Sequence, residues 1–295
     1  MNNLYQFPIT RFAITFKAKT DIILPDYAES ALRGIFGYAL KNMACLTAKG
    51  HHGQCRCVPQ ECLYRMIFDP AGQSLTHRTQ VQDVPPPFVI EAHSLPTHIK
   101  QGQTATFYMV LIGKMAHDEQ TIIRLAWQQA LAGGLNQAGK SKATVELIAF
   151  ELCDAPHSHK PFLRDDLVLD LVTHTRIQHH GKILGAGNFC VKALFQTLLR
   201  RYLTVVQVYG SVPIDEQQIS QLYQDIDNIN GSHQLQSYPW SRYSNRQKQK
   251  IHQDGLIGKI ELYNVSERLY YLLYLGQWLH VGKGGAFGLG QYKIR

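Results

Sequence analysis

The sequence lacks several features that would assign it to common protein classes. No uninterrupted apolar run approaches the length needed to cross a lipid bilayer, so we expect a soluble protein with no membrane partner. The first residues, MNNLYQFPITRF, contain no basic segment followed by an apolar stretch and a small-residue cleavage site. No secretory signal is therefore visible, and we expect a cytoplasmic location.

Two common hydrolytic chemistries also lack the residues they need. The GxSxG motif of a serine nucleophile does not occur in the chain, which argues against a serine hydrolase. A metal-dependent nuclease needs clustered carboxylates, and the nearest group is Asp165, Asp166 and Asp170. Because side chains alternate between the two faces of a strand, these carboxylates would be split between both faces. The sequence thus disfavours a metal nuclease.

Cysteine is infrequent and unevenly placed. The chain has 6 cysteines, and without a secretory signal they are more plausibly thiols or metal ligands than disulfides. Four of them lie close together near two histidines: Cys45, Cys55, Cys57 and Cys62, with His51 and His52. Structural zinc sites usually separate paired ligands by two to four residues, whereas only one residue separates Cys55 from Cys57. We therefore expect no cofactor, with a structural zinc ion at these four cysteines as the alternative.

What the chain has in excess is positive charge. Its 30 Lys and Arg residues outnumber 22 Asp and Glu residues, which gives a formal net charge of +8 at pH 7. The 14 histidines add charge below neutrality. This balance favours an anionic partner, with nucleic acid as the first candidate. A length of 295 residues suits one large or two medium domains.

The first half of the chain shows a strand, helix, strand, strand, helix, strand pattern. PITRFAITFKA alternates as a strand, and residues 27–46 repeat apolar positions at helical spacing. PPFVIEA and TATFYMVLIG indicate two further strands, residues 118–131 a helix capped by Asp118, and KATVELIAFEL a closing strand.

The second half repeats this order. DLVLDLVTHTRI opens it as a strand, followed by a helix over 188–206 and by the strand candidates QLQSYPWSRYS and GLIGKIELY. A helix over 266–280 capped by Ser266 and a closing strand QYKIR complete the pattern. The sequence predicts an α+β protein with two tandem ferredoxin-like (RRM-like) βαββαβ domains, 1–155 and 162–295, joined by a polar, proline-containing linker.

A basic segment lies just before the strand candidate GLIGKIELY. Arg242, Arg246, Lys248 and Lys250 all occupy even-numbered positions, so in an extended hairpin they would project from one face. Their neighbours are polar too, which leaves a solvated edge or an RNA-binding surface. Trp240 and Tyr243 could stack on bases, which favours RNA. Arg200 and Arg201 either extend this track or complement a helix dipole.

The most distinctive segment is WLHVGKGGAFGLGQYKIR, a glycine-rich loop that follows a helix and precedes a strand. A phosphate loop of nucleotide-binding proteins runs in the opposite order, from strand to glycines to helix. Glycines leave backbone amides open to a polyanionic chain. The candidate RNA-binding positions are Gly282, Lys283, Gly284, Gly285, Phe287, Gly288 and Gly290. The alternative is a flexible surface turn.

Blocks near both ends of the chain together resemble a known family. The segments RYSNRQKQK, GLIGKIELY and LGQWLHVGKGGAFGLGQYKI are similar to the C-terminal signature of the CRISPR precursor-RNA-processing endoribonucleases, the Cas6 family of the repeat-associated mysterious protein (RAMP) superfamily. ALRGIFGYALKNMAC and CLYRMIFDP resemble the opening of one branch of that family. The resemblance implies the same tandem fold, with CRISPR repeat RNA and CRISPR effector-complex subunits as partners.

The resemblance also implies a reaction. The RNA's own 2′-hydroxyl attacks the adjacent phosphorus without a catalytic metal, giving a 2′,3′-cyclic phosphate and a 5′-hydroxyl, and the mature guide RNA can be retained. In relatives the active histidine often follows the first helix, where this chain has His51 and His52, with Tyr38 as an assisting group. The alternative for the two histidines is a metal site or a surface loop.

The sequence leaves the roles of two further residues undecided. His280 is a second catalytic candidate beside the glycine loop, or a histidine interacting with the end of a helix. Arg33 could contact RNA or pair with a carboxylate. The alternative function is a guide-RNA-binding subunit of a CRISPR effector complex without catalysis.

Overall fold

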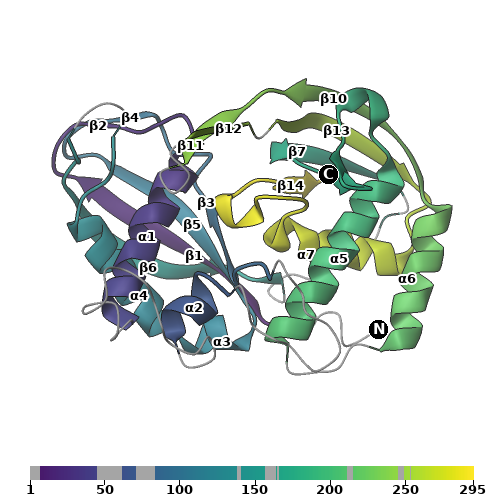
Figure 1. The fold of residues 1–295 in the computed structure, drawn as a ribbon, viewed down its shortest axis with the longest axis horizontal. Helices are drawn as coiled ribbons and strands as arrows, with labels where there is room; N and C mark the ends of the chain where they lie inside the picture. Colours follow the sequence, from purple (N-terminus) through teal and green to yellow (C-terminus); the bar gives the residue numbers. More distant parts are fainter. Residues whose placement is uncertain are drawn as a thin grey trace. The chain divides into compact units, whose positions relative to one another are not determined.

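The computed structural model describes residues 7–44, 62–70, 84–137, 141–156, 164, 166–210, 215–244, 249–252 and 254–295. The chain forms two compact units (Figure 1). The N-terminal unit is Pro8–Ala155 with Gln207–Ser211, and the C-terminal unit consists mainly of Pro156–Val206 and Val212–Arg295. No helix in the described part of the chain is long and apolar enough to span a membrane.

The N-terminal unit is a four-stranded antiparallel sheet covered by two helices. Its main elements are β1 (Ile9–Ala18), α1 (Ala28–Ala44), β3 (Phe88–Glu91), β5 (Thr104–Ile112), α4 (Gln120–Ala132) and β6 (Val145–Asp154). The strand order is β3-β5-β1-β6. Short elements join them: β2 (Ile22–Ile23), α2 (Leu63–Ile67), β4 (His98–Ile99) and α3 (Lys114–Asp118).

Aromatic side chains fill the core of this unit. Phe36 from α1 stacks on Trp127 from α4 with ring centroids 4.9 Å apart, and Phe107 from β5 meets the same indole edge-on at 4.8 Å. All three side chains are fully buried. Such rings bury a large apolar area each and add a geometric preference, so this contact fixes both helices on the sheet.

The C-terminal unit has the same sheet with additional segments. Its main elements are β7 (Leu167–Thr175), α5 (Val191–Tyr209), β10 (Asn230–Tyr238), β13 (Gly255–Tyr263), α7 (Glu267–Leu279) and β14 (Tyr292–Ile294). The strand order is β10-β13-β7-β14. The additions are β8 (Gln178–His179), β9 (Lys182–Ile183), the 3₁₀ turns η4 (Ala186–Asn188) and η5 (Gly285–Phe287), α6 (Glu216–Asn228), β11 (Ser241–Ser244) and β12 (Gln249–His252).

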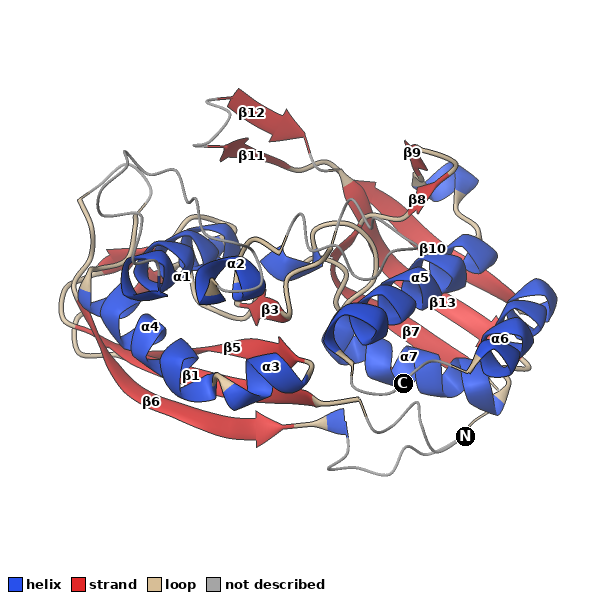
Figure 2. Cartoon of the chain, turned by 60° about the horizontal axis from the view of Figure 1, so that its bottom comes forward, coloured by secondary structure: helices blue, strands red, loops and turns tan. Residues whose placement is uncertain are grey.

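Both sheets place their strands in the order second, third, first, fourth, and in both the helices cover one face only (Figure 2). This is the βαββαβ topology twice. The prediction of an α+β protein with two tandem ferredoxin-like domains is confirmed.

The two expected helix caps have different outcomes. The Ser266 hydroxyl accepts a hydrogen bond from the N–H of Leu269 at 3.3 Å, so it caps α7 as predicted. The prediction that Asp118 caps the second helix of the N-terminal unit is wrong. Asp118 ends the short helix α3, and α4 begins after Glu119, whose side chain makes no capping bond.

Candidate nucleic-acid interface

The glycine-rich loop joins α7 to β14 and is folded tightly onto the end of β7. Gly282, Gly284, Gly288 and Gly290 all have φ between 77° and 88°, a backbone region that L-residues rarely adopt. A Cβ atom at Gly290 would overlap the carbonyl of Val281, and one at Gly282 would overlap the carbonyl of Arg176. These positions therefore require glycine for the backbone path that the loop takes.

Many of the loop's amides are used to hold this shape. The N–H of Lys283 donates to the carbonyl of Arg176 at 2.9 Å, and the N–H of Gly290 donates to that of His174 at 3.2 Å. No described group accepts a hydrogen bond from the N–H groups of Gly284, Gly285 or Ala286. The amides without a described acceptor are thus fewer than the glycine count implies, and they lie in one short stretch in which Gly284 is half-buried and Gly285 and Ala286 are buried.

A cation lies directly against that stretch. The Nε of Arg201, on α5, donates to the carbonyl of Leu279 at 2.6 Å. A Cβ atom at Gly285 would lie 2.9 Å from a terminal guanidinium nitrogen of Arg201, so the guanidinium and the loop backbone are in contact. Arg200, by contrast, is exposed. The sequence treated the two arginines alike, and the structure joins only Arg201 to the loop.

His280 is fully buried at the end of α7. Its backbone has φ 60° and ψ 159°, and its backbone N–H donates to the carbonyl of Gly276. The ring Nδ1 lies 3.1 Å from the carbonyl oxygen of Leu289. Contact between this ring and RNA requires the loop to open. A role in holding the two ends of the loop together requires no change.

The site residues predicted on α1 differ in accessibility. The Tyr38 side chain is 72% exposed, so its hydroxyl is available to a bound molecule. The Arg33 guanidinium lies over the Phe68 ring, 4.1 Å from its centroid, and donates to the Phe68 carbonyl at 3.4 Å. Arg33 therefore holds the segment that follows α2 against α1.

Other predicted residues lie outside the described ranges: His51, His52, Cys45, Cys55, Cys57, Arg246 and Lys248. Cys62, the fourth cysteine of the possible zinc site, is buried at the start of α2. Among the described residues there is no group of three or more His, Cys, Asp or Glu side chains that could hold a metal ion.

The basic segment forms the two-stranded ribbon β11–β12. We call Arg242, Arg246, Lys248 and Lys250 the hairpin basic residues. The register pairs Arg242 with Ile251 and Tyr243 with Lys250. Positions directly opposite each other belong to the same face of a ribbon, so positions 242 and 250 belong to opposite faces. The expectation that all four residues share one face is not met by this register.

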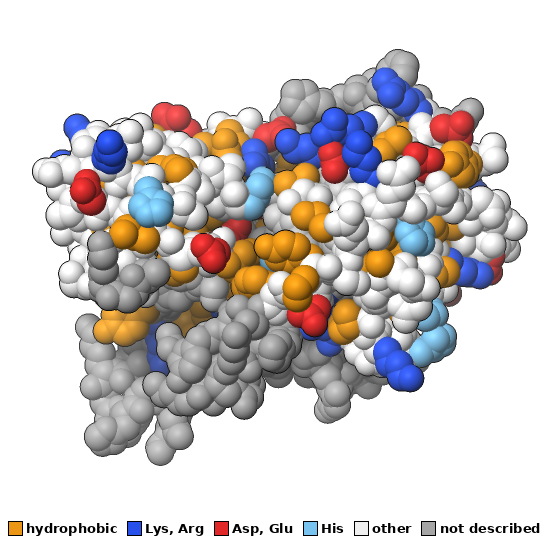
Figure 3. Space-filling model, turned by 90° about the horizontal axis from the view of Figure 1, so that it is seen from above, with side chains coloured by type: hydrophobic (Ala, Val, Ile, Leu, Met, Phe, Trp, Pro, Cys, Tyr) orange, Lys and Arg blue, Asp and Glu red, His pale blue; other side chains and the backbone are white. Residues whose placement is uncertain are grey.

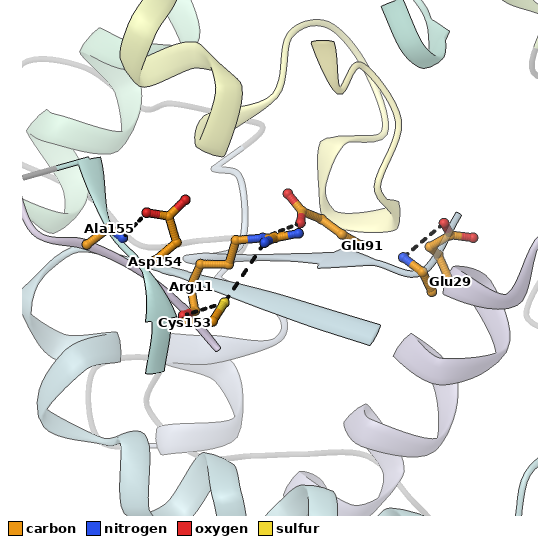
Figure 4. A network of polar contacts seen from close by, with 7 residues as sticks. Arg11, Glu29, Glu91, Cys153, Asp154 and Ala155 are labelled. Carbon is orange, nitrogen blue, oxygen red and sulfur yellow. Dashed lines mark hydrogen bonds and ion pairs between the residues drawn. The ribbon is translucent and has the colours of Figure 1, made fainter. Parts of the chain in front are cut away.

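Buried charges gather in the N-terminal unit (Figure 4). The Arg11 guanidinium pairs with Glu91 at 2.7 Å, and Glu91 is 2% exposed. Glu29, at the start of α1, accepts the Ala92 N–H at 3.2 Å. Burial raises the pKa of Glu29 to about 7, and the nearby Glu91 acts in the same direction.

On the face drawn in Figure 3, Lys and Arg side chains form one larger group with acidic side chains beside it.

His174 is a site residue that no sequence pattern indicates. It is the next-to-last residue of β7, is 8% exposed, and its carbonyl holds the glycine loop. Burial lowers the pKa of its imidazole to about 4, with Arg176 acting in the same direction. A histidine within an apolar strand pattern carries no sequence signal for such a position, because the contact depends on segments far apart in the chain.

Comparisons with known proteins agree with this architecture. Residues 169–292 match the family model described as CRISPR-associated endoribonuclease Cas6, and residues 7–172 match a model described as an N-terminal domain. No curated protein matches the sequence.

Solved Cas6 structures have the same fold along the whole chain. A Cas6 product complex matches with TM-score 0.61 at 13% identity, covering 98% of this chain and 100% of the other. Thermus thermophilus Cas6 matches with TM-score 0.56 at 12% identity, covering 98% of this chain and 99% of the other. The product of a Cas6-related gene from Pyrococcus furiosus matches with TM-score 0.53 at 9% identity, covering 98% and 99%. Residues 169–292 thus match the Cas6 family of CRISPR-associated endoribonucleases, and the whole chain has the fold of solved Cas6 structures.

Proposed function

We propose that this protein cuts precursor CRISPR RNA within its repeats by a metal-independent transesterification and retains the mature guide RNA. In this reaction the 2′-oxygen forms a bond to the adjacent phosphorus while the bond from phosphorus to the 5′-oxygen breaks. A general base takes the 2′-hydroxyl proton, and a general acid protonates the leaving 5′-oxygen. The products are a 2′,3′-cyclic phosphate and a 5′-hydroxyl.

The observation that supports the proposal best is the geometry of the glycine loop within the segment that matches the Cas6 family model. The amides of Gly284–Ala286 and the Arg201 guanidinium lie together, and both are suited to a phosphate group. Fixed donors of this kind stabilise charge without reorganising during the reaction.

We assign the proton transfers to the segment after α1. Histidine titrates near neutrality and can serve as base or acid, so His51 and His52 are the first candidates, with the exposed Tyr38 as an assisting donor. His280 is assigned to shaping the loop because its ring is fully buried. Alanine variants separate these roles. His51→Ala or His52→Ala lowers the cleavage rate with RNA affinity unchanged, whereas His280→Ala weakens RNA binding.

The experiment is to incubate the purified chain with its cognate repeat RNA in excess chelator. Cleavage that yields a 2′,3′-cyclic phosphate supports the proposal, and replacing the 2′-hydroxyl next to the cut by hydrogen abolishes cleavage. Cleavage of that deoxy substrate rejects the mechanism. Co-migration of product with protein on a sizing column tests retention.

The second candidate function is a guide-RNA-binding subunit without catalysis. A solved partial complex titled Cas6-RT-Cas1–Cas2, matched with TM-score 0.53 at 14% identity, contains a chain of which this fold covers 46%. Tight RNA binding without product in the chelator experiment, and also with added divalent metal, favours that function. Other CRISPR proteins are proposed partners in either case.

A further inference from the structure

Three aromatic rings lie together where β7 and β10 end. The His174 ring stacks on Tyr238 with centroids 5.5 Å apart and planes 20° apart, and it meets Trp240 at 4.9 Å with planes 46° apart. His174 is buried, Trp240 is half-buried, and Tyr238 is 46% exposed. Because His174 covers one face of the phenol ring, the exposed part of Tyr238 is its other face and its edges.

This aromatic cluster is held rigidly at the root of the basic hairpin. The Trp240 N–H donates to a carboxylate oxygen of Asp254 at 3.0 Å, and the Nε of Arg176 donates to the Asp254 carbonyl at 3.1 Å. The register places Tyr238 opposite Gly255, a residue without a side chain. Gly255 therefore has no side chain that could cover the Tyr238 ring.

The cluster and the glycine loop share the same backbone. The carbonyl of His174 accepts from Gly290, and the carbonyl of Arg176 accepts from Lys283. The glycine loop and the Tyr238 ring are therefore both held at the C-terminal end of β7. An RNA whose phosphate binds at the loop has this flat ring available for one of its bases. Bases stack on such rings with little regard to their identity, because every base has a π-face.

The chemistry of the cluster fits an uncharged base rather than a phosphate. The three rings are aromatic, and the imidazole that supports Tyr238 is neutral at physiological pH because burial lowers its pKa. An edge strand of the sheet carries the site: apart from the half-buried Leu235, β10 is exposed along its whole length. A base can thus reach Tyr238 without displacing a core residue.

We propose that Tyr238, supported by His174 and flanked by Trp240, stacks one unpaired base of the bound RNA. This inference rests on the proposed function, because the ligand is the same repeat RNA. It adds a structural requirement to the substrate: an unpaired nucleotide must lie beside the phosphate held by the glycine loop. Fully paired RNA lacks that nucleotide and binds more weakly.

The test measures the affinity of the full-length chain for its cognate repeat RNA at several salt concentrations. Tyr238→Ala lowers affinity by about 5-fold to about 150-fold, the range that corresponds to loss of one stacked base. The slope of affinity against salt stays unchanged, because that slope counts phosphate contacts. Tyr238→Phe keeps the wild-type affinity. Tyr223→Ala, a control on α6 with the same 46% exposure, also keeps it.

Two further arms distinguish stacking from simple cover. Tyr238→Leu retains apolar cover but no flat ring, so it behaves like Tyr238→Ala if the ring stacks, and wild-type affinity in this variant overturns the inference. A series of repeat RNAs with one base removed identifies a position whose loss weakens wild-type binding but not Tyr238→Ala binding.

The failures are separable. Equal affinity of Tyr238→Ala and wild type overturns the stacking site while wild-type cleavage leaves the proposed function intact. A wild-type chain that neither binds nor cuts repeat RNA overturns both.

Discussion

Replacing Glu29 by glutamine tests how the N-terminal unit responds to pH. The Glu29 side chain is 1% exposed and sits in the first turn of α1, where the helix dipole favours a negative charge by up to about 1 kcal/mol. Burial outweighs that effect and raises its pKa to about 7. In the unfolded chain the pKa returns to its ordinary value of 4.5.

The direction in which the free energy of unfolding changes with pH follows from proton binding. Between pH 4.5 and about 7 the folded unit holds a proton on Glu29 that the unfolded chain releases, so the free energy of unfolding falls as the pH rises through this window. The difference between the two pKa values corresponds to about 3 kcal/mol above pH 7. Glutamine keeps an oxygen that can accept the Ala92 N–H and has no charge to bury.

We therefore expect Glu29→Gln to match the wild type near pH 4 and to be more stable by up to about 3 kcal/mol at pH 8. Urea unfolding followed by the fluorescence of Trp127 measures this, with Trp240→Phe and Trp278→Phe in both proteins so that the signal comes from the N-terminal unit. Glu151→Gln, an exposed position on β6, is the control and produces no pH-dependent difference. A stability difference for Glu29→Gln that is the same at pH 5 and pH 8 refutes the reasoning.

Three further perturbations address the C-terminal unit. Gly290→Ala forces a side chain into a backbone with φ 77° and lowers the midpoint temperature of unfolding by several degrees. Gly187→Ala, with open space around it, changes that temperature little, and calorimetry compares the two variants. Arg201→Ala removes the bond to the Leu279 carbonyl and weakens repeat-RNA binding, and the exposed Arg200→Ala weakens it less; equal losses contradict the assignment to Arg201. Replacing all four hairpin basic residues by glutamine weakens binding and reduces the slope of log affinity against log salt by about 3, at about 0.7 per phosphate contact on single-stranded RNA. An unchanged slope removes the hairpin from the RNA-binding surface.

Periodicity predicted most of the repeated elements because they depend on local patterns. Strands with alternating burial, such as β1, and helices with one apolar face follow directly from residue spacing. The α6 helix was missed although Asp215 caps it and Leu222 and Ile226 face inward, because its remaining positions are strongly polar. The segment QLQSYPWSRYS was predicted as one strand, but proline and tryptophan interrupt it between β10 and β11.

The site was less predictable because it depends on contacts between distant segments. The sequence identified the glycine loop but not its backbone path, and the path decides which amides remain available. His280 was selected for its neighbours, and its burial and positive φ are visible only in the folded chain. His174 and Arg201 were likewise invisible as loop contacts, since they lie more than 70 residues before the loop in the sequence.

The internal repeat places a comparable connection in both units. In both units the connection between the second helix and the fourth strand is closed at its base by backbone hydrogen bonds: Leu135 with Ala143 in the N-terminal unit, and Val281 to Gly290 in the C-terminal unit. The fold therefore closes the base of this connection in both units. Glycines at left-handed positions fold the second connection onto β7 and leave the N–H groups of Gly284, Gly285 and Ala286 without a described acceptor, with Gly285 beside the Arg201 guanidinium. In sequence the second connection is richer in glycine than the first, and in the structure Arg201 from α5 contacts it.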